Sequence, residues 1–292
     1  MNNFDYAAPT TLAEAIALLA ASNGTARILA GGTDLIVQLR ERLREADLVI
    51  DIKRIPELTQ CLDSDGHGLR LGAAVPCYQV YEKENLARNY PALADAAQII
   101  GGWQIQSRAS VGGNLCNSSP AGDSIAPLIA LGVSCVIASP GATREVAAEE
   151  FCTAPGRNVL RKGELLATLV FPAAKPNSGS AYQRFIPRNE MDIAVAGVAS
   201  WVRLDESRSA IMDARIALSA VAPTPKFASE ASAWLVGKPA TEDTFARAGE
   251  LARKAASPIS DMRGTSEFRT HLVGVLTQRT LATAIQRARQ SQ

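Results

Sequence analysis

Two short glycine-rich segments, far apart in the chain, constrain this sequence more than any other feature. The first is AGGTDL at residues 30–35, and the second is SVGGNL at residues 110–115. Each contains two adjacent residues without a β-carbon, so backbone N–H groups there can closely approach the oxygens of a phosphate. The polar groups of Thr33, Ser110 and Asn114 can complete such a site. Together the segments predict a clamp for the diphosphate of one dinucleotide.

A glycine pair is also an ordinary turn former, so the surroundings of each segment matter. The first segment follows the apolar run at 28–30 and precedes a predicted helix over 34–44, whose amino end would face the same anion. The second precedes a predicted helix over 119–130, with Pro120 in its first turn. Neither segment reads G-x-G-x-x-G or G-x-x-x-x-G-K-S/T, which argues against a Rossmann site and a P-loop.

The chain divides into three predicted units. Residues 1–54 read as a small βαβ unit, and residues 55–176 change to short strands and turns that form a second α/β unit. A connector rich in Pro, Gly and Ser at 172–180 then leads to a C-terminal unit, residues 177–292. That last unit begins with three extended apolar runs and ends with helices, which predicts an antiparallel three-stranded sheet covered by helices.

Local patterns predict individual elements inside these units. A capping box at Thr11 opens a helix over 12–21. Strands are predicted at 27–30, 48–52, 69–75, 134–139, 165–171, 181–186, 193–204 and 211–222, and a turn at 63–66. Further helices are predicted at 226–236, 241–257 and 266–289.

Composition excludes several classes of function. The 292 residues carry a net charge of +1, which gives no electrostatic reason to expect nucleic acid or an anionic membrane as partner. Hydrophobic content of 47% with 20% charged residues is typical of a globular protein. The amino terminus lacks a signal peptide, and no apolar stretch is long enough to span a bilayer. We therefore expect a cytoplasmic protein.

The cysteines argue against a metal or redox centre in this chain. They are odd in number and widely spaced, at Cys61, Cys77, Cys116, Cys135 and Cys152. This spacing predicts no disulfide framework, no C-x-x-C motif and none of the grouped thiolates that an iron–sulfur cluster needs. The motifs H-E-x-x-H and G-x-S-x-G are absent too. We predict no metal site and no catalytic nucleophile.

Three motifs, in this order along the chain, resemble the FAD-binding (medium) subunit or domain of the molybdenum hydroxylases, the family of xanthine dehydrogenase and carbon monoxide dehydrogenase. They are AGGTDL at 30–35, ASVGGNL at 109–115 followed by Ser119, Pro120 and Asp123, and RFIPR at 184–188 leading to DIA at 192–194. The resemblance covers nearly the whole chain. It implies an α+β (α/β) fold, with a two-part FAD-binding region of the molybdenum hydroxylase / vanillyl-alcohol-oxidase type before the C-terminal unit.

The resemblance also implies which residues contact FAD. Asp123 would accept hydrogen bonds from sugar or ribityl hydroxyls, Leu166 would lie against the isoalloxazine ring, and Ile100 would pack near the adenine. Arg184 would lie near the pyrimidine edge, where a guanidinium stabilises the negative charge of the reduced flavin. The expected cofactor-binding residues are Leu29, Ala30, Gly31, Gly32, Thr33, Asp34, Leu35, Ile100, Ser110, Gly112, Gly113, Asn114, Asp123, Leu166 and Arg184.

The residues by themselves leave other roles open. Asp34 and Asp123 can cap helices, Arg184 can be a solvated strand residue, and Leu166 can belong to an ordinary core.

The function that the resemblance implies is electron transfer. In the family, a large subunit with molybdopterin hydroxylates the substrate, and a small subunit with two [2Fe-2S] centres relays electrons to FAD. The flavin then reduces NAD, oxygen or another acceptor. Met191 stands before Asp192 where NAD-reducing relatives can carry another acid, so the acceptor stays open. The substrate stays open as well, because its pocket would belong to another polypeptide.

Two other functions stay open. One is a self-sufficient FAD-dependent oxidase of a small molecule, in which Tyr182 could transfer a proton. The other is a flavin-free structural subunit. If the family resemblance holds, this chain is instead part of a heterotrimer with the large molybdopterin subunit and the small iron–sulfur subunit.

Overall fold

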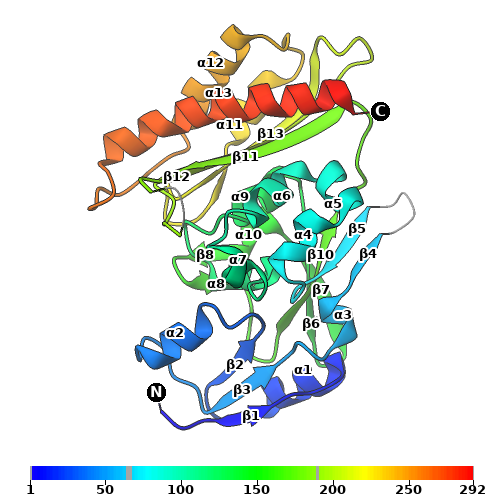
Figure 1. Ribbon diagram of the computed structural model, residues 1–292, viewed down its shortest axis with the longest axis vertical. Helices are drawn as coiled ribbons and strands as arrows, with labels where there is room; N and C mark the ends of the chain where they lie inside the picture. The colour runs from blue at the N-terminus through cyan, green and yellow to red at the C-terminus, as the bar shows by residue number, and fades with distance from the viewer. Residues whose placement is uncertain (1, 64–67, 189–190, 292) are drawn as a thin grey trace.

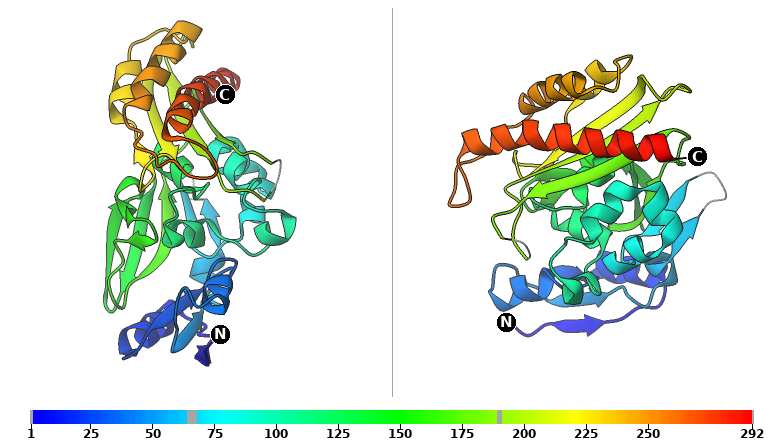
Figure 2. Two further views of the ribbon diagram at one scale, coloured as in Figure 1. Left: turned by 90° about the vertical axis from the view of Figure 1, so that its left-hand side faces the viewer. Right: turned by 45° about the horizontal axis from the view of Figure 1, so that its top comes forward.

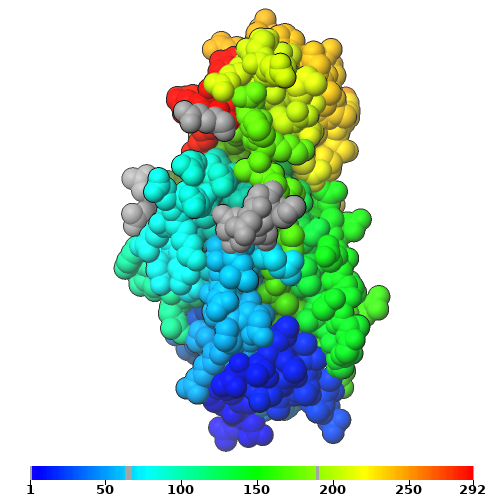
Figure 3. Space-filling model, turned by 90° about the vertical axis from the view of Figure 1, so that its right-hand side faces the viewer, coloured from blue at the N-terminus to red at the C-terminus, as the bar shows by residue number. Residues whose placement is uncertain are grey.

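Three units lie one after another along the long axis of the molecule (Figure 1). The computed structural model describes residues 2–63, 68–188 and 191–291. A three-stranded sheet forms the first unit, a five-stranded sheet the second and a four-stranded sheet the third. The same order is visible from the side in Figure 3, with the N-terminal unit at one end and the C-terminal helices at the other. This arrangement confirms the expected α+β fold class.

The first unit is a parallel sheet with strand order β1-β3-β2. Its elements are β1 (Asp5–Ala7), α1 (Leu12–Ala21), β2 (Ala26–Leu29), α2 (Leu35–Arg40) and β3 (Leu48–Asp51). The predicted capping box is confirmed, because the Thr11 hydroxyl accepts from the Glu14 N–H while the Glu14 carboxylate accepts from the Thr11 N–H. Helix α2 is shorter than predicted because Arg42 adopts a φ of 58°, which a right-handed helix cannot contain.

The second unit is built on an antiparallel sheet with strand order β4-β5-β10-β6-β7. Its strands are β4 (Cys61–Asp63), β5 (Leu69–Gly72), β6 (Ser134–Ser139), β7 (Ala142–Ala147) and β10 (Leu165–Phe171), beside a small hairpin of β8 (Cys152–Ala154) and β9 (Arg157–Asn158). The predictions of β6 and β10 are confirmed to the residue. The turn predicted at 63–66 lies outside the described residues, apart from Asp63 at its start.

The prediction of mostly strands and turns in this unit was wrong. Its helices are α3 (Pro56–Thr59), α4 (Cys77–Glu82), α5 (Glu84–Asn89), α6 (Pro91–Ala97), α7 (Trp103–Gln106), α8 (Val111–Asn117), α9 (Ile125–Ala130) and α10 (Ala148–Phe151). Each is too short to show an amphipathic period over an 11-residue window. The helix predicted over 119–130 is present only as α9, because residues 119–124 form a turn.

The third unit is an antiparallel sheet with strand order β11-β12-β13-β14. Its elements are β11 (Ser178–Phe185), β12 (Ala196–Leu204), β13 (Ile211–Ser219), β14 (Lys226–Phe227), α11 (Ser229–Leu235), α12 (Glu242–Arg253) and α13 (Ser266–Gln290). The three predicted strands are present, and β14 adds a fourth where a helix was expected. Figure 2 shows the long α13 lying across β11 and β12 beside α12.

A shared apolar core joins the first unit to the second. Ile50 and Ile52 of the β3 region pack in one buried cluster with Ala138 of β6 and with Leu165 and Ala167 of β10. This contact places the loop after β2 beside α8, which is where the two glycine segments lie. Among the described residues, no helix is long and apolar enough to cross a membrane. The predicted unit boundaries, 1–54, 55–176 and 177–292, fall between β3 and α3 and between β10 and β11, and they stay predictions.

Candidate cofactor-binding site

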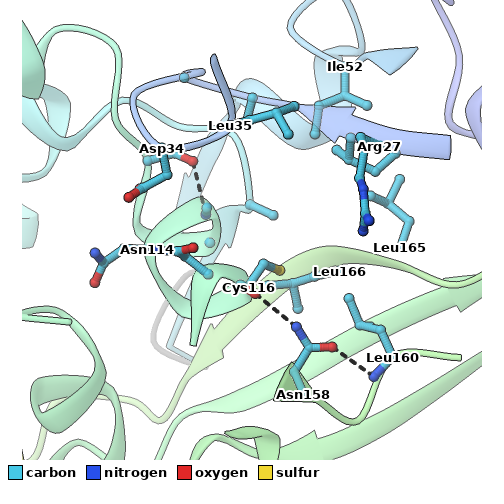
Figure 4. A pocket seen from close by; sticks show the side chains of 18 of the residues that line it. Arg27, Asp34, Leu35, Ile52, Asn114, Cys116, Asn158, Leu160, Leu165 and Leu166 are labelled. Carbon is cyan, nitrogen blue, oxygen red and sulfur yellow. Dashed lines mark hydrogen bonds between the residues drawn. The ribbon is translucent and has the colours of Figure 1, made fainter. Parts of the chain in front are cut away.

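A cavity of about 1070 Å³ lies between the first and second units (Figure 4). It is slightly larger than the range, about 300–1,000 Å³, that is typical of ligand pockets. Of the expected cofactor-binding residues, those that line it are Ala30, Gly31, Gly32, Thr33, Asp34, Leu35, Ile100, Ser110, Gly112, Gly113, Asn114 and Leu166. Leu29, Asp123 and Arg184 are not part of this lining. The structure thus brings both glycine segments to one space.

The first glycine segment is in close contact with the chain just before the second. Gly31 packs so tightly that a β-carbon would overlap the main chain of Arg108 and Ala109. Gly32 has a φ of +78°, a conformation that favours glycine. Within the part of the chain that the structure describes, the N–H groups of residues 32–35 donate to no protein acceptor. These amides are therefore available to an anion in the cavity.

The second glycine pair lies inside α8, where the sequence had indicated a segment before a helix. Ser110 caps this helix, and its hydroxyl accepts a hydrogen bond of 3.1 Å from the Gly113 N–H. Gly112 faces Ala73, whose main chain a β-carbon would overlap. Asn114 is held by Ser124, which donates to its Oδ1 through its hydroxyl at 2.8 Å and its N–H at 3.3 Å. Glycine is needed here for close packing within a helix.

The cavity wall carries an excess of positive charge that the sequence did not predict. Its cations are Arg27, Arg44, Arg157, Arg161 and Lys162, against the two carboxylates of Asp34 and Glu164. Such a wall favours an anionic ligand. In Figure 4, Arg27 and Leu165 lie on one side of the cavity and Asp34 and Asn114 on the other.

The electrostatic state of two wall residues follows from their neighbours. Glu164 accepts from both Nε and a terminal nitrogen of Arg144, at 2.8 and 2.7 Å, and these bonds lower the pKa of Glu164 to about 2. Burial, and after it the charge of Arg44, lowers the pKa of Arg27. Glu164 is therefore ionised, and its negative charge is compensated by Arg144, which is not part of the cavity lining. The wall keeps an excess of positive charge.

Asp123 and Arg184 form a buried ion pair with each other. The other Asp123 oxygen accepts from the Tyr182 hydroxyl at 2.8 Å, and Arg184 donates to the carbonyl of Ile99 at 2.8 Å. Burial raises the pKa of Asp123 to about 6, and the Arg184 charge opposes that rise. The pair thus lies directly behind the wall residue Ile100, and its predicted contact with FAD stays a prediction.

Cys116 is the cysteine that lines the cavity. Burial raises the pKa of its thiol to about 12, so it is a neutral, unreactive group. Across residues 2–63, 68–188 and 191–291, no cluster of His, Cys, Asp and Glu is suited to a metal ion. The segment 187–191, which ends at Met191, includes two residues outside the described ranges.

Two further parts of the wall were not predicted. Residues 153–164, around the β8–β9 hairpin, close one side, and Asn158 anchors them by donating to the Cys116 carbonyl at 2.9 Å. Gln38 and Asn117 meet at another side. The only available signal was the run of basic residues at 157–162, which the sequence pattern does not connect to either glycine segment.

Family models match almost the entire chain. One described as the FAD binding domain in molybdopterin dehydrogenase matches residues 2–174, and one described as the CO dehydrogenase flavoprotein C-terminal domain matches residues 180–284. The xanthine dehydrogenase FAD-binding subunit of Escherichia coli O157:H7 is 34% identical over 286 residues, which cover 97% of each chain. The carbon monoxide dehydrogenase medium chain of Hydrogenophaga pseudoflava is 31% identical and covers 96% of each chain.

Solved structures agree with these matches. A carbon monoxide dehydrogenase chain from Hydrogenophaga pseudoflava superposes with a TM-score of 0.93 at 31% identity, covering 98% of each chain. A chain of quinoline 2-oxidoreductase from Pseudomonas putida 86 superposes with a TM-score of 0.90 at 30% identity, again covering 98% of each chain. With two family models and relatives above 30% identity along nearly its whole length, this chain belongs to the FAD-binding medium-subunit family of the molybdenum hydroxylases.

Proposed function

We propose that this chain binds FAD in the cavity between its first two units and serves as the electron-transfer subunit of a molybdopterin-dependent dehydrogenase. The observation that carries the proposal is the packing of Gly31 against Arg108 and Ala109, which sets both glycine segments around one cavity. A diphosphate needs main-chain donors from a position where no β-carbon intervenes. The first segment meets that requirement through the amides of residues 32–35, and the second contributes Ser110, Gly112 and Gly113 to the wall of the same cavity.

The residues of the cavity fit FAD in charge and in shape. The unpaired amides of residues 32–35 would hold the diphosphate, and the surrounding cations would balance its negative charge. Ile52, Leu165 and Leu166 offer apolar wall to a flat ring. Arg184 lies behind the lining residue Ile100, where its buried Nε–H has no acceptor among the described residues, so its contact with the flavin stays a prediction.

The proposed partners follow from the family. We propose a heterotrimer with a large molybdopterin subunit and a small subunit that carries [2Fe-2S] centres, located in the cytoplasm where NAD is available as acceptor. Bound FAD would take electrons from the iron–sulfur subunit and pass them to NAD, oxygen or another acceptor. This chain's own contribution is to hold the cofactor in a positively charged cavity, in which the thiol of the lining residue Cys116 is neutral.

The position of Tyr182 disfavours a self-sufficient oxidase. Its hydroxyl is buried between Asp123 and Ser219, outside the cavity lining, and burial raises its pKa well above the usual value. A proton-transfer group must reach its substrate, directly or through one water. We therefore expect the isolated chain to oxidise no organic substrate, whereas the complex with its partners passes substrate electrons to the flavin.

Absorbance of the purified chain tests the proposal. We expect a yellow protein with stoichiometric FAD, and a colourless protein after the combined changes Gly112→Val and Gly113→Val. A side chain at 112 would overlap the Ala73 main chain, and one at 113 would meet the Ser110 hydroxyl, so the start of α8 would shift away from its place in the cavity wall. Gly102→Ala serves as control, because its β-carbon meets only the flexible end of Gln104. A parent chain without affinity for FAD would support the flavin-free alternative, and stoichiometric FAD in the valine variant would contradict the clamp.

A further inference from the structure

Two polar contacts tie the first unit to the second at the wall of the cavity. The Gln38 side chain donates from Nε2 to Asn117 Oδ1 at 3.1 Å, and the Arg44 guanidinium donates to the Gly156 carbonyl at 3.2 Å. Gln38 and Arg44 belong to the first unit, and Asn117 and Gly156 belong to the second. All four residues also line the cavity. Each contact therefore closes the space that the two units share.

The two sides of this junction differ in chemistry. Ile50 and Ile52 pack with Ala138 and Leu165 in a buried apolar cluster, which water does not enter. Gln38, Arg44 and Asn117 are only partly buried, so water can replace their hydrogen bonds at small cost. When a structure opens locally, hydrogen bonds that are only partly buried break at a lower free energy than a buried apolar core. The polar side of the junction is therefore the side that we expect to open first, with the apolar cluster remaining packed.

On each side of these two polar contacts, hydrogen bonds within the unit hold the contacting segments together. In the second unit, the Gly156 N–H donates to the Ser118 carbonyl at 3.0 Å and Asn158 donates to the Cys116 carbonyl, so the hairpin and the end of α8 hold together. In the first unit, Gln38 lies on α2, and its N–H donates to the carbonyl of Asp34 at 2.9 Å. A movement of α2 away from α8 therefore carries the first glycine segment with it.

We propose that the pairs Gln38–Asn117 and Arg44–Gly156 form a latch that keeps the first unit closed over the bound dinucleotide and sets the rate at which it leaves. This inference rests on the proposed FAD site, because the retained ligand is that cofactor. The latch lowers the frequency with which the two units separate. Gln38 and Asn117 contribute to it through their mutual hydrogen bond.

Dissociation of FAD from the full chain, purified with any subunits that accompany it, tests the latch. We expect Gln38→Leu and Asn117→Ala each to speed FAD release by about 3- to 10-fold, the size expected for one exchangeable hydrogen bond. The double variant should release FAD no faster than the stronger single variant, because both changes break one contact. Arg40→Gln, on the exposed face of the same helix, should release FAD at the parental rate. Multiplicative effects of the two changes would show independent contacts with FAD and would overturn the latch.

A second measurement separates failure of the latch from failure of the FAD site. In the cofactor-free chain, amide hydrogen exchange in α2 should be faster in Gln38→Leu than in the parent or in Arg40→Gln, because the junction opens more often. A parent that binds no FAD overturns the proposed function, whereas unchanged exchange in α2 overturns the latch even if FAD binds. Retained melting temperature of each variant confirms that the fold is intact.

Discussion

Arg184 and Asp123 form an ion pair in which both side chains are more than nine-tenths buried. Arg184 lies on β11 of the third unit, and Asp123 lies in the turn between α8 and α9 of the second. The same guanidinium donates to the carbonyl of Ile99, the residue next to the wall residue Ile100. One side chain thus connects the third unit to two parts of the cavity-bearing unit.

Removing one partner of this pair should be costly. We expect Asp123→Asn to lower the free energy of unfolding by about 3–5 kcal/mol, because it leaves the Arg184 charge buried without compensation. The joint change Asp123→Leu and Arg184→Leu should recover a large part of that loss, since no buried charge remains. Urea denaturation measures both. The exposed pair Arg247–Glu250 provides the comparison, where Glu250→Gln should cost well under about 1 kcal/mol.

A β-carbon at Gly31 should disrupt the clamp without changing any charge. Gly31→Ala would overlap the Arg108 carbonyl, so the two glycine segments must move apart. We expect a loss of about 1–3 kcal/mol in stability, typical of overpacking, and a rise of at least about tenfold in the Kd for FAD. Equilibrium titration of the cofactor-free chain measures the affinity, with Gly102→Ala as control. Parental affinity in Gly31→Ala would contradict the close approach as a requirement for binding.

Glu164 should make stability depend on pH in the acid range. Its pKa is about 2 in the folded chain because Arg144 donates to both carboxylate oxygens, against an ordinary value of 4.5. A lowered folded pKa stabilises the fold above pH 4.5, and that contribution is lost as the pH falls from 4.5 towards 2. We expect Glu164→Gln to cost about 1–2 kcal/mol at pH 7 and almost nothing at pH 2, after allowance for solvent screening. Urea midpoints across this range measure the difference, and a constant gap at all pH values would contradict the assignment.

The positive wall should accelerate binding of the anionic cofactor. We expect the association rate of FAD to fall by about tenfold between low salt and 0.5 M salt, because screening shortens the reach of the wall's field. The joint change Arg161→Gln and Lys162→Gln should flatten this dependence, whereas Lys254→Gln, paired with Glu230 on the third unit, should leave it unchanged. Stopped-flow flavin fluorescence follows the rates. An association rate insensitive to salt would exclude steering.

The parts of the fold that the sequence predicted well are those with strong local signals. The capping box at Thr11 located α1, and long alternating or apolar runs located β6, β10 and the three long strands of the third unit. Helix α6 gave no such signal, because Ala92, Leu93, Ala94, Ala96 and Ala97 are buried on nearly every side and show no amphipathic period. Short helices of this kind form through tertiary packing.

In the candidate site, too, features with a local sequence signal were predictable and those that depend on tertiary contacts were not. The glycine segments were recognisable because close main-chain approach demands glycine at fixed positions. Gln38 and Asn117 were not, because they are 79 residues apart and meet only after two units fold against each other. The position of the second glycine pair inside α8 was missed for a related reason. Gly112 is required by its packing against Ala73, a contact that no local pattern reveals.

Every lining residue of the cavity within the described ranges precedes β11. The third unit therefore supports this compartment from outside, in part through Arg184, without forming its walls. Mutations that accumulate on the solvent face of α12 or α13 leave the compartment untouched. Natural variation can therefore change the outer surface of the third unit while every wall of the proposed FAD cavity is inherited unaltered.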